Sequence, residues 1–457
     1  MAPSDPSAHE STPDGAVIPP EPSNPARSRI TRVKTLLSGQ AAQEGYLAVI
    51  DQSIISLSNF LATLILARTV SPTELGMYGV GFTSLRLVRS IQEGLTIQPL
   101  NTFGAAQELP EFRRYATSTS LIQVILAVLS AVSAAVLGIL LIRTGNDVAG
   151  PTIFALWHNF LWWQLQEYVR RVLYTRGAVR SAVINTLIAN SVRLGLMFYW
   201  LSKDQLTGVS GLDAIAWGSL VALIPGLWQT RSYWTSAFDP ILATLKKNWH
   251  FGKWIMGGVL ANWVSLEFYP VLTAGMVSFA AAGAYRAIQN LVAPIHMLLR
   301  AIDTFLTPRA AKTYQGTGMP GLARMLRLAY LLTGVPVLVI LGIAVLFPKQ
   351  ILEFLYGSTY LEYSNAVVLM AIFYALLFAY WPLQAAFKAI HLSRPIFIAN
   401  GTAILVMFTL GIWTILELGV YGTILGQILN ALVVAAILWI TWLSVFQQSK
   451  KDPDMQE

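Results

Sequence analysis

Long apolar runs alternate with short polar segments over most of the 457-residue chain. The hydrocarbon core of a bilayer is about 30 Å thick, so an α-helix needs about 20 predominantly apolar residues to cross it. Twelve runs predict spanning helices at roughly 45–67, 76–104, 117–142, 150–173, 181–201, 212–232, 252–272, 276–307, 322–347, 363–387, 395–416 and 420–446. The pattern therefore predicts an all-α, polytopic membrane protein.

The two ends of the chain have a different composition. Residues 1–30 hold seven prolines among mostly small or polar residues, and such a segment cannot bury enough apolar surface to fold. We expect a disordered cytoplasmic tail at 1–30, a short interfacial helix at 31–44 and a second cytoplasmic tail at 447–457.

An amphipathic connection at 233–251 divides the predicted spans into two sets of six, and we expect it to be a linker helix on the inner surface. The lobes would be 45–232 and 252–446. Five residues recur 207 positions later: Ala67, Val70, Ser71, Gly76 and Tyr78 match Ala274, Val277, Ser278, Gly283 and Tyr285. Six is even, so both halves start on the same side of the membrane and form a parallel repeat about an axis along its normal. Two such lobes predict a central cavity and alternating access.

Basic residues separate by side of the membrane. Of 31 Lys and Arg, 22 fall on the side of the termini and only Arg68, Arg143, Lys203 and Lys349 on the other. Loops rich in Lys and Arg stay cytoplasmic, so both termini are predicted inside, in a cell inner membrane. This sorting explains the net charge of +8 without a nucleic-acid partner. Hydrophobic residues reach 55%, charged residues only 12%, and the absence of cysteine excludes disulfides and cysteine-type zinc sites.

The remaining five basic residues fall inside spans, and we expect function to depend on them: Arg86, Arg89, Arg193, Arg286 and Arg300. Each charge at the bilayer centre costs at least ~2.5–3.5 kcal/mol, which favours a wet cavity or an anionic ligand. A guanidinium grips phosphate through a planar fork of donors. These arginines, with Gln289 and Asn59, are the predicted substrate-binding residues. No catalytic residue, metal ligand or cofactor is predicted.

Carboxylates near the predicted cavity suggest a second role. Asp51, Glu93 and Glu267 are candidates for coupling to H⁺ or Na⁺. A purely structural interpretation competes: Arg89 and Glu93 lie one turn apart and could neutralise each other, while Glu167 near an inner end could anchor topology.

Four stretches resemble a known group: NFLATLILARTVSPTELGMYGV (59–80), AAGAYRAIQNLVAP (281–294), PKQILEFLYGSTY (348–360) and GVYGTILG (419–426). They are similar to segments of prokaryotic polysaccharide flippases of the multidrug, oligosaccharidyl-lipid and polysaccharide exporter superfamily. The resemblance implies twelve helices around a cationic cavity and outward flipping of an undecaprenyl-pyrophosphate-linked oligosaccharide. Its partners would be that lipid-linked oligosaccharide, membrane lipids and a polysaccharide polymerase.

Other classes compete with this hypothesis. A cation-coupled multidrug antiporter of the same superfamily is the main alternative, although it would favour an acidic, aromatic cavity. A polytopic glycosyltransferase or polymer ligase would need a substantial external loop with carboxylates or histidine, and the predicted external loops are short. ATP-driven transport would need a G-x4-G-K-[ST] loop, which the sequence lacks. The sequence therefore favours a transporter over an enzyme.

Overall fold

The computed structural model of the protein describes residues 40–451, and within this range the side chains of residues 40–42, 297, 300–305, 307, 308, 450 and 451 lie outside the description. The tail predicted at 1–30, most of the helix predicted at 31–44 and the end of the tail predicted at 447–457 also lie outside the described residues. Residues from 48 onward form one compact unit.

The described residues are helical almost throughout and include no strand. The first half contains α2 (Gln40–Thr69), α3 (Pro72–Gln92), the π-helices η1 (Glu93–Ile97) and η2 (Leu100–Gly104), α4 (Leu109–Arg143), α5 (Ala149–Phe154), α6 (Leu156–Thr175), α7 (Val179–Ser202), α8 (Gly208–Thr230) and the 3-10 turn η3 (Arg231–Tyr233). The second half contains α9 (Ile241–Glu267), α10 (Tyr269–Met276), α11 (Phe279–Leu291), α12 (Ala293–Leu346), α13 (Pro348–Tyr356), η4 (Gly357–Tyr363), α14 (Ser364–Ala389), α15 (Arg394–Val406), the π-helix η5 (Met407–Gly411) and α16 (Ile412–Lys451). Each of the twelve predicted spans corresponds to one of these helices, a part of one, or a run of two or three consecutive elements.

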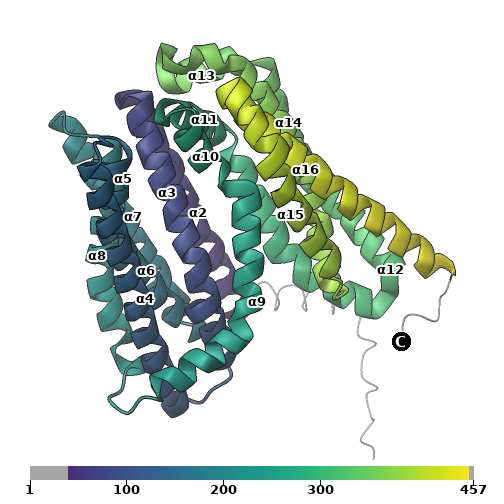
Figure 1. Ribbon diagram of the computed structural model, residues 1–457. Coiled ribbons are helices and arrows are strands. Elements are labelled where there is room, and N and C mark those ends of the chain that lie inside the picture. Colours follow the sequence, from purple (N-terminus) through teal and green to yellow (C-terminus); the bar gives the residue numbers. More distant parts are fainter. Residues whose placement is uncertain (1–39, 452–457) are drawn as a thin grey trace, which may run out of the picture. The chain divides into compact units, whose positions relative to one another are not determined.

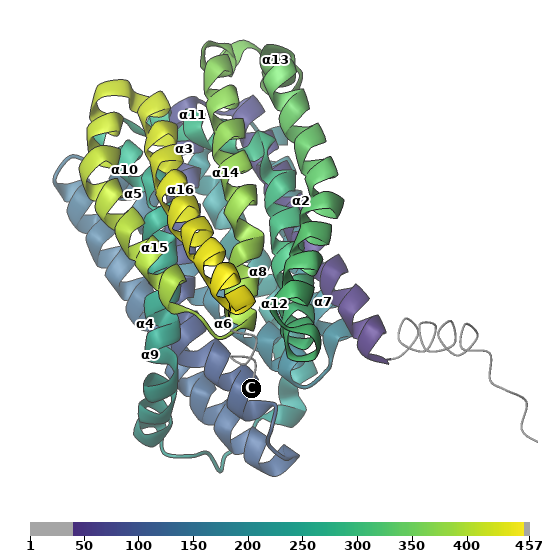
Figure 2. The same ribbon diagram turned by 90° about the vertical axis from the view of Figure 1, so that its right-hand side faces the viewer.

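Within the unit from residue 48, helices of the two halves gather separately. Figure 1 shows α4–α8 on one side and α12 with α14–α16 on the other, with α3, α9, α10 and α11 between them. The view turned by 90° shows α14 and α16 crossing in front of this middle layer (Figure 2). The equivalent helices α3 and α11 of the two halves pack directly against each other, which is consistent with a parallel repeat.

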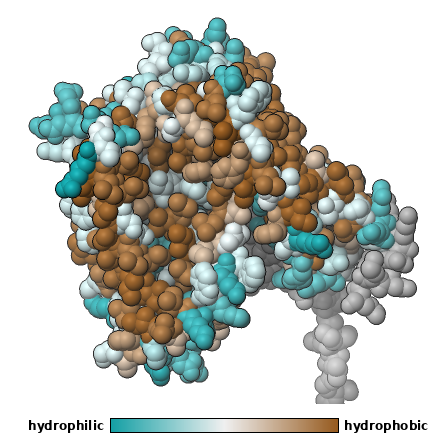
Figure 3. All heavy atoms as spheres, viewed as in Figure 1, coloured by the Kyte–Doolittle hydropathy of each residue, from teal (hydrophilic) through white to brown (hydrophobic). Residues whose placement is uncertain are grey.

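Apolar side chains cover the outside of this unit. Figure 3 shows a hydrophobic belt over its middle, with hydrophilic residues gathered toward the two ends. In α4 the buried side is small (Ala127, Ala131 and Ala134), while Leu129 and Val132 are more than half exposed. Small residues let helices approach closely inside a membrane while branched apolar residues face lipid. The protein is therefore a multi-pass membrane protein.

Not every helix is apolar enough to span on its own. Within the described residues seven helical segments are long and apolar enough to cross a membrane, or eight if the bent pair α9–α10 is one span. The helices α3 and α6 do not reach that hydropathy, because they carry Arg86, Arg89, Glu167 and Arg170. These charges face a chamber rather than lipid.

The structure differs from the predicted boundaries at the connection between the halves. The linker helix expected at 233–251 is the first part of α9, which starts at Ile241 and continues unbroken to Glu267. Gly252 lies inside this helix, and its lack of a side chain lets α9 pack closely against the backbone of Gly94 in η1. The break comes at Phe268 instead, where α9 and α10 meet at 50°. Spans eight and nine meet within α12, where the non-helical backbone of Gly318 (φ 62°) breaks the helix between them.

Candidate functional site

A chamber of about 640 Å³ lies among α2, α3, α6, α7, α8 and α9. Four arginines and three glutamates form part of its wall: Arg86, Arg89, Arg170, Arg193, Glu93, Glu167 and Glu267. A smaller cavity of about 130 Å³ lies on the side of the second half. Arg86, Asn262 and Glu267 contribute to the walls of both, so the two spaces adjoin at these side chains. The smaller cavity is an annex of the chamber.

The position of α3 places two arginines in the chamber. The helix starts with Ser71 accepting a hydrogen bond from the Glu74 backbone N–H at 3.3 Å and with Pro72 in its first turn, a favoured N-terminal combination. Arg86 and Arg89 follow near its other end, one turn apart on the same face. The backbone then widens into the π-helix η1 at Glu93, a distortion that often accompanies functional sites.

Arg86 forms an ion pair with Glu267, the last residue of α9. A carboxylate at a helix C-terminus opposes the helix dipole, so Arg86 stabilises a charge that the helix itself disfavours. The bend after Glu267 also frees backbone carbonyls in the last turn of α9. Gln427 donates to the Leu266 carbonyl at 3.1 Å and Asn430 to the Ser265 carbonyl at 2.9 Å. The free carbonyls at the end of α9 are thus hydrogen-bonded by α16, and the charge of Glu267 is paired by Arg86 of α3.

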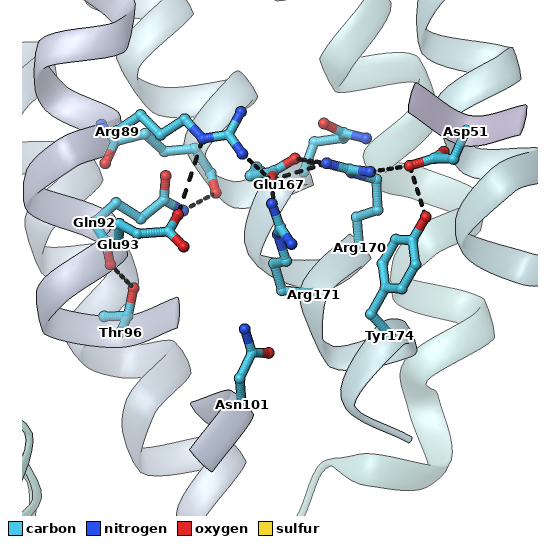
Figure 4. Close-up of polar contacts among 12 residues, drawn as sticks. Asp51, Arg89, Gln92, Glu93, Thr96, Asn101, Glu167, Arg170, Arg171 and Tyr174 are labelled. Atoms are coloured by element: carbon cyan, nitrogen blue, oxygen red, sulfur yellow. Dashed lines mark hydrogen bonds and ion pairs between the residues drawn. The ribbon is translucent and has the colours of Figure 1, made fainter. Parts of the chain in front are cut away.

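Arg89 belongs to a second ionic group, centred on Glu167. The Glu167 carboxylate lies 3.3 Å from Arg89, 2.7 Å from Arg170 and 2.9 Å from Arg171, and its side chain is only 4% exposed. Arg170 also pairs with Asp51, which accepts a 2.7 Å hydrogen bond from the Tyr174 hydroxyl. Figure 4 shows these side chains converging from α2, α3 and α6. One buried carboxylate therefore holds three guanidinium groups in place.

Arg193 links two further helices at the chamber wall. It donates to the Asn59 side chain at 2.8 Å and to the Tyr78 hydroxyl. The second half contains a counterpart: Gln427 donates to the hydroxyl of Tyr285 at 2.8 Å and to the backbone of Leu266. Tyr285 and Leu266 lie 207 positions after Tyr78 and Asn59. Both halves therefore tie their first two spans together at equivalent places, with different donors.

Three solved structures with this architecture are transporters of one superfamily. The chain superposes on a multidrug resistance MATE family transporter of the MOP superfamily in its inward-facing conformation with a TM-score of 0.70, 14% sequence identity and coverage of 88% of this chain and 99% of that one. For an outward-facing MATE transporter of the same superfamily the TM-score is 0.63, at 16% identity and 91% and 98% coverage. A MOP superfamily transporter from Pyrococcus furiosus, whose reversed binding-pocket polarity suggests a different function, gives 0.63 at 15% identity and 91% and 98% coverage.

The chain has the fold of a MATE transporter. This confirms the predicted all-α membrane architecture and the expectation of a transporter fold rather than an enzyme fold. No protein-family model matches the chain, and no curated protein matches it by sequence.

The structure brings most of the predicted site residues to one place. The residues that line the chamber are Arg86, Arg89, Arg193, Asn59, Glu93 and Glu267. Gln289 lines the annex. Asp51 lies in the ionic group of Glu167 and reaches the chamber only through Arg170.

The predicted arginine Arg286 stands apart from this set. Arg286 donates to Gln289 at 3.0 Å, and its guanidinium carbon lies 5.0 Å from the centre of the Phe82 ring. It is absent from both cavity walls as described. The side chain of Arg300 lies outside the described residues.

Sequence reasoning missed the residues at the centre of the ionic group. It placed Arg170 and Arg171 among the inner-side basic residues and treated Glu167 as a topology anchor, but Glu167 and Arg170 are buried in the chamber wall. The available signal was the spacing of Glu167, Arg170 and Arg171 at i, i+3 and i+4, which puts all three on one helical face. These pairs also change the electrostatics: within the described wall arginines exceed glutamates by only one.

Proposed function

We propose that the protein is a flippase that moves a polyprenyl-pyrophosphate-linked oligosaccharide from the inner to the outer leaflet of a cell inner membrane by alternating access. One observation carries the proposal: Arg86, Arg89, Arg170 and Arg193 meet in one chamber of a MATE transporter fold. Guanidinium groups stay charged at any physiological pH and bind phosphate oxygens in pairs. A chamber of this kind favours an anionic headgroup.

Binding would proceed by exchange of ion-pair partners. A pyrophosphate entering the chamber replaces Glu267 at Arg86 and reaches Arg89, whose side chain is 36% exposed on the chamber side of the Glu167 group. Arg170, only 6% exposed and held by Asp51 and Glu167, acts as fixed positive charge behind Arg89. The displaced carboxylate of Glu267, with Glu93 and Asp51, then provides sites where H⁺ or Na⁺ can compensate the freed negative charge.

Contacts at one end of the two halves support alternating access. Here α3 packs against α11, and Arg68 at the end of α2 donates to the carbonyls of Phe354 and Leu355 in α13. Arg68 belongs to the sparse basic group on the predicted outer side. With cytoplasmic termini, as the loop charges predict, this closed end faces outward and the chamber takes its substrate from the inner leaflet. A membrane potential that is negative inside favours outward movement of an anion by ~2.3 kcal/mol per charge per 100 mV.

The test removes the guanidinium without leaving an unpaired buried carboxylate. We expect the double variant Arg86→Gln with Glu267→Gln to lose binding of undecaprenyl pyrophosphate and export of surface glycan. The chamber keeps its net charge, but it loses the guanidinium group that donates hydrogen bonds to the phosphate. Arg143→Ala, at an exposed position outside the chamber, is the matched control. Normal glycan export by the double variant at normal protein level would refute the proposal.

A second candidate function is cation-coupled export of organic cations. It is favoured by the MATE neighbours and by Glu93, Glu167 and Glu267 beside Trp163 and Trp263 in the chamber wall. The pairing of these glutamates with arginines weighs against it, because an organic cation would have to displace a guanidinium. A deletion strain that becomes sensitive to cationic drugs and keeps its surface glycan would favour this alternative.

A further inference from the structure

The annex differs chemically from the chamber that it adjoins. Its described wall has one cation and one carboxylate, Arg86 and Glu267, and these are paired with each other at the boundary. Beyond them the wall combines the apolar side chains of Phe373, Leu377 and Trp381 with uncharged polar groups. Those polar groups are Asn262, Gln289, Gln427 and His296.

This composition excludes some ligand classes and favours another. A second phosphate would find no cation among the described side chains except Arg86, which the first phosphate occupies. An organic cation would find only Glu267, already paired with Arg86. A purely apolar tail would leave the Asn262 amide, which has no other hydrogen-bond partner among the described residues, without water as well, which is costly. Aromatic faces beside neutral donors and acceptors suit an uncharged ring that has apolar C–H faces and hydroxyl edges, which is the surface of a pyranose sugar.

Hydrogen bonds hold the polar wall in a fixed geometry. The Tyr374 hydroxyl lies 2.7 Å from His296 Nδ1, and Gln289 donates to the Tyr285 hydroxyl at 3.1 Å. Gln427 bonds to the same Tyr285 hydroxyl at 2.8 Å. Side chains fixed in this way bind a ligand with less loss of conformational entropy than mobile ones. The Asn262 amide, at the boundary, has no hydrogen-bond partner among the described residues.

We propose that the annex binds the sugar ring attached directly to the pyrophosphate, while Arg86 holds the neighbouring phosphate. This inference rests on the proposed flippase function and adds to it separate binding sites for the sugar and for the phosphate. Because Arg86 belongs to both walls, a phosphate bound to it lies at the boundary of the annex, and its sugar substituent can extend into that cavity. Trp381 and Asn262 then select the first sugar, and the chamber arginines accept any polyprenyl pyrophosphate.

The experiment measures binding of two probes to the full-length protein in lipid nanodiscs by native mass spectrometry. One probe is undecaprenyl pyrophosphate, and the other is the same lipid carrying a single N-acetylhexosamine. Trp381→Leu removes the aromatic face and retains apolar bulk. Trp413→Leu, at a 60% exposed position outside both cavities, is the matched control.

We expect Trp381→Leu to weaken binding of the sugar-bearing probe by about tenfold and to leave the sugar-free probe unchanged, with no effect of Trp413→Leu on either. If Trp381→Leu folds poorly, Phe373→Leu removes the other aromatic face of the annex, lies outside the described chamber wall and should show the same selectivity. Equal effects on both probes, or none on either, would overturn the annex assignment while wild-type binding of the sugar-free probe keeps the flippase proposal intact. If the wild type bound neither probe, both the annex assignment and the flippase proposal would be refuted.

Discussion

Gly76 and Gly283 occupy equivalent positions in the two halves of the chain, 207 residues apart, and they pack against each other. A Cβ atom on Gly76 would collide with the carbonyl of Phe279, and one on Gly283 with the carbonyl of Pro72. Phe279 is itself 207 positions after Pro72, so the contact is reciprocal. Such reciprocity is expected where a two-fold axis passes between two related helices, and it locates the axis of the repeat between α3 and α11.

We predict that Gly76→Ala separates α3 from α11. The new methyl group meets rigid backbone, so the helices must shift, at a cost of about 1–3 kcal/mol. The closed end of the molecule would then open, and cysteines introduced at Pro72 and Phe279 should crosslink less readily in the variant. Gly195→Ala is the control, because its Cβ would meet nothing within 4 Å. Unchanged crosslinking in Gly76→Ala would show that this contact does not close the molecule.

The carboxylate of Glu167 offers a test of the buried ionic group. Replacing it by glutamine leaves Arg89, Arg170 and Arg171 without their shared partner, and breaking a buried ion pair costs about 3–5 kcal/mol. We expect Glu167→Gln to lower the thermal unfolding midpoint of the purified protein strongly. The exposed Glu353 provides the control substitution Glu353→Gln, which should have little effect. Equal stability of the two variants would contradict the structural role assigned to Glu167.

Glu267 should restrain the cation that it pairs with. In Glu267→Gln the Arg86 guanidinium loses its competing carboxylate, so undecaprenyl pyrophosphate should bind more tightly than to the wild type. If the Glu267 carboxylate takes up the coupling ion in the wild type, the variant lacks that site, and its glycan export should fall while binding rises. Binding in nanodiscs and export in cells measure the two effects separately. Weaker binding in this variant would mean that Glu267 assists the ligand rather than competing with it.

The tyrosine hydrogen bonds at equivalent places in the two halves should both contribute to the stability of the fold. Tyr78→Phe removes an acceptor of Arg193, and Tyr285→Phe removes a partner of both Gln427 and Gln289. A hydrogen bond to a charged group contributes about 1.5–3 kcal/mol and a neutral one about 0.5–1.5 kcal/mol. Because Tyr285 loses its neutral bonds to both Gln427 and Gln289 and Tyr78 loses a single charged one, Tyr285→Phe should destabilise at least as much as Tyr78→Phe. Thermal unfolding of both variants tests this order, with exposed Tyr199→Phe as the control.

The positions of the helices could be predicted from the sequence, because the length of an apolar run is a local property set by membrane thickness. The repeat was also visible, since Ser71, Gly76 and Tyr78 have direct counterparts in the second half. Helical spacing placed Arg86, Arg89 and Glu93 on one face, and all three line the chamber. The sidedness of the termini and the roles of these residues in transport stay predictions.

Which faces meet was decided only by the tertiary structure. Asp51 and Arg170 are 119 residues apart in the chain, and periodicity along either helix does not identify the other as its partner. The same holds for Arg86 and Glu267, which pair because α9 packs beside α3. A charge inside a membrane must find a partner or water, so the sequence shows that these arginines need one. The packing of helices determines which they have.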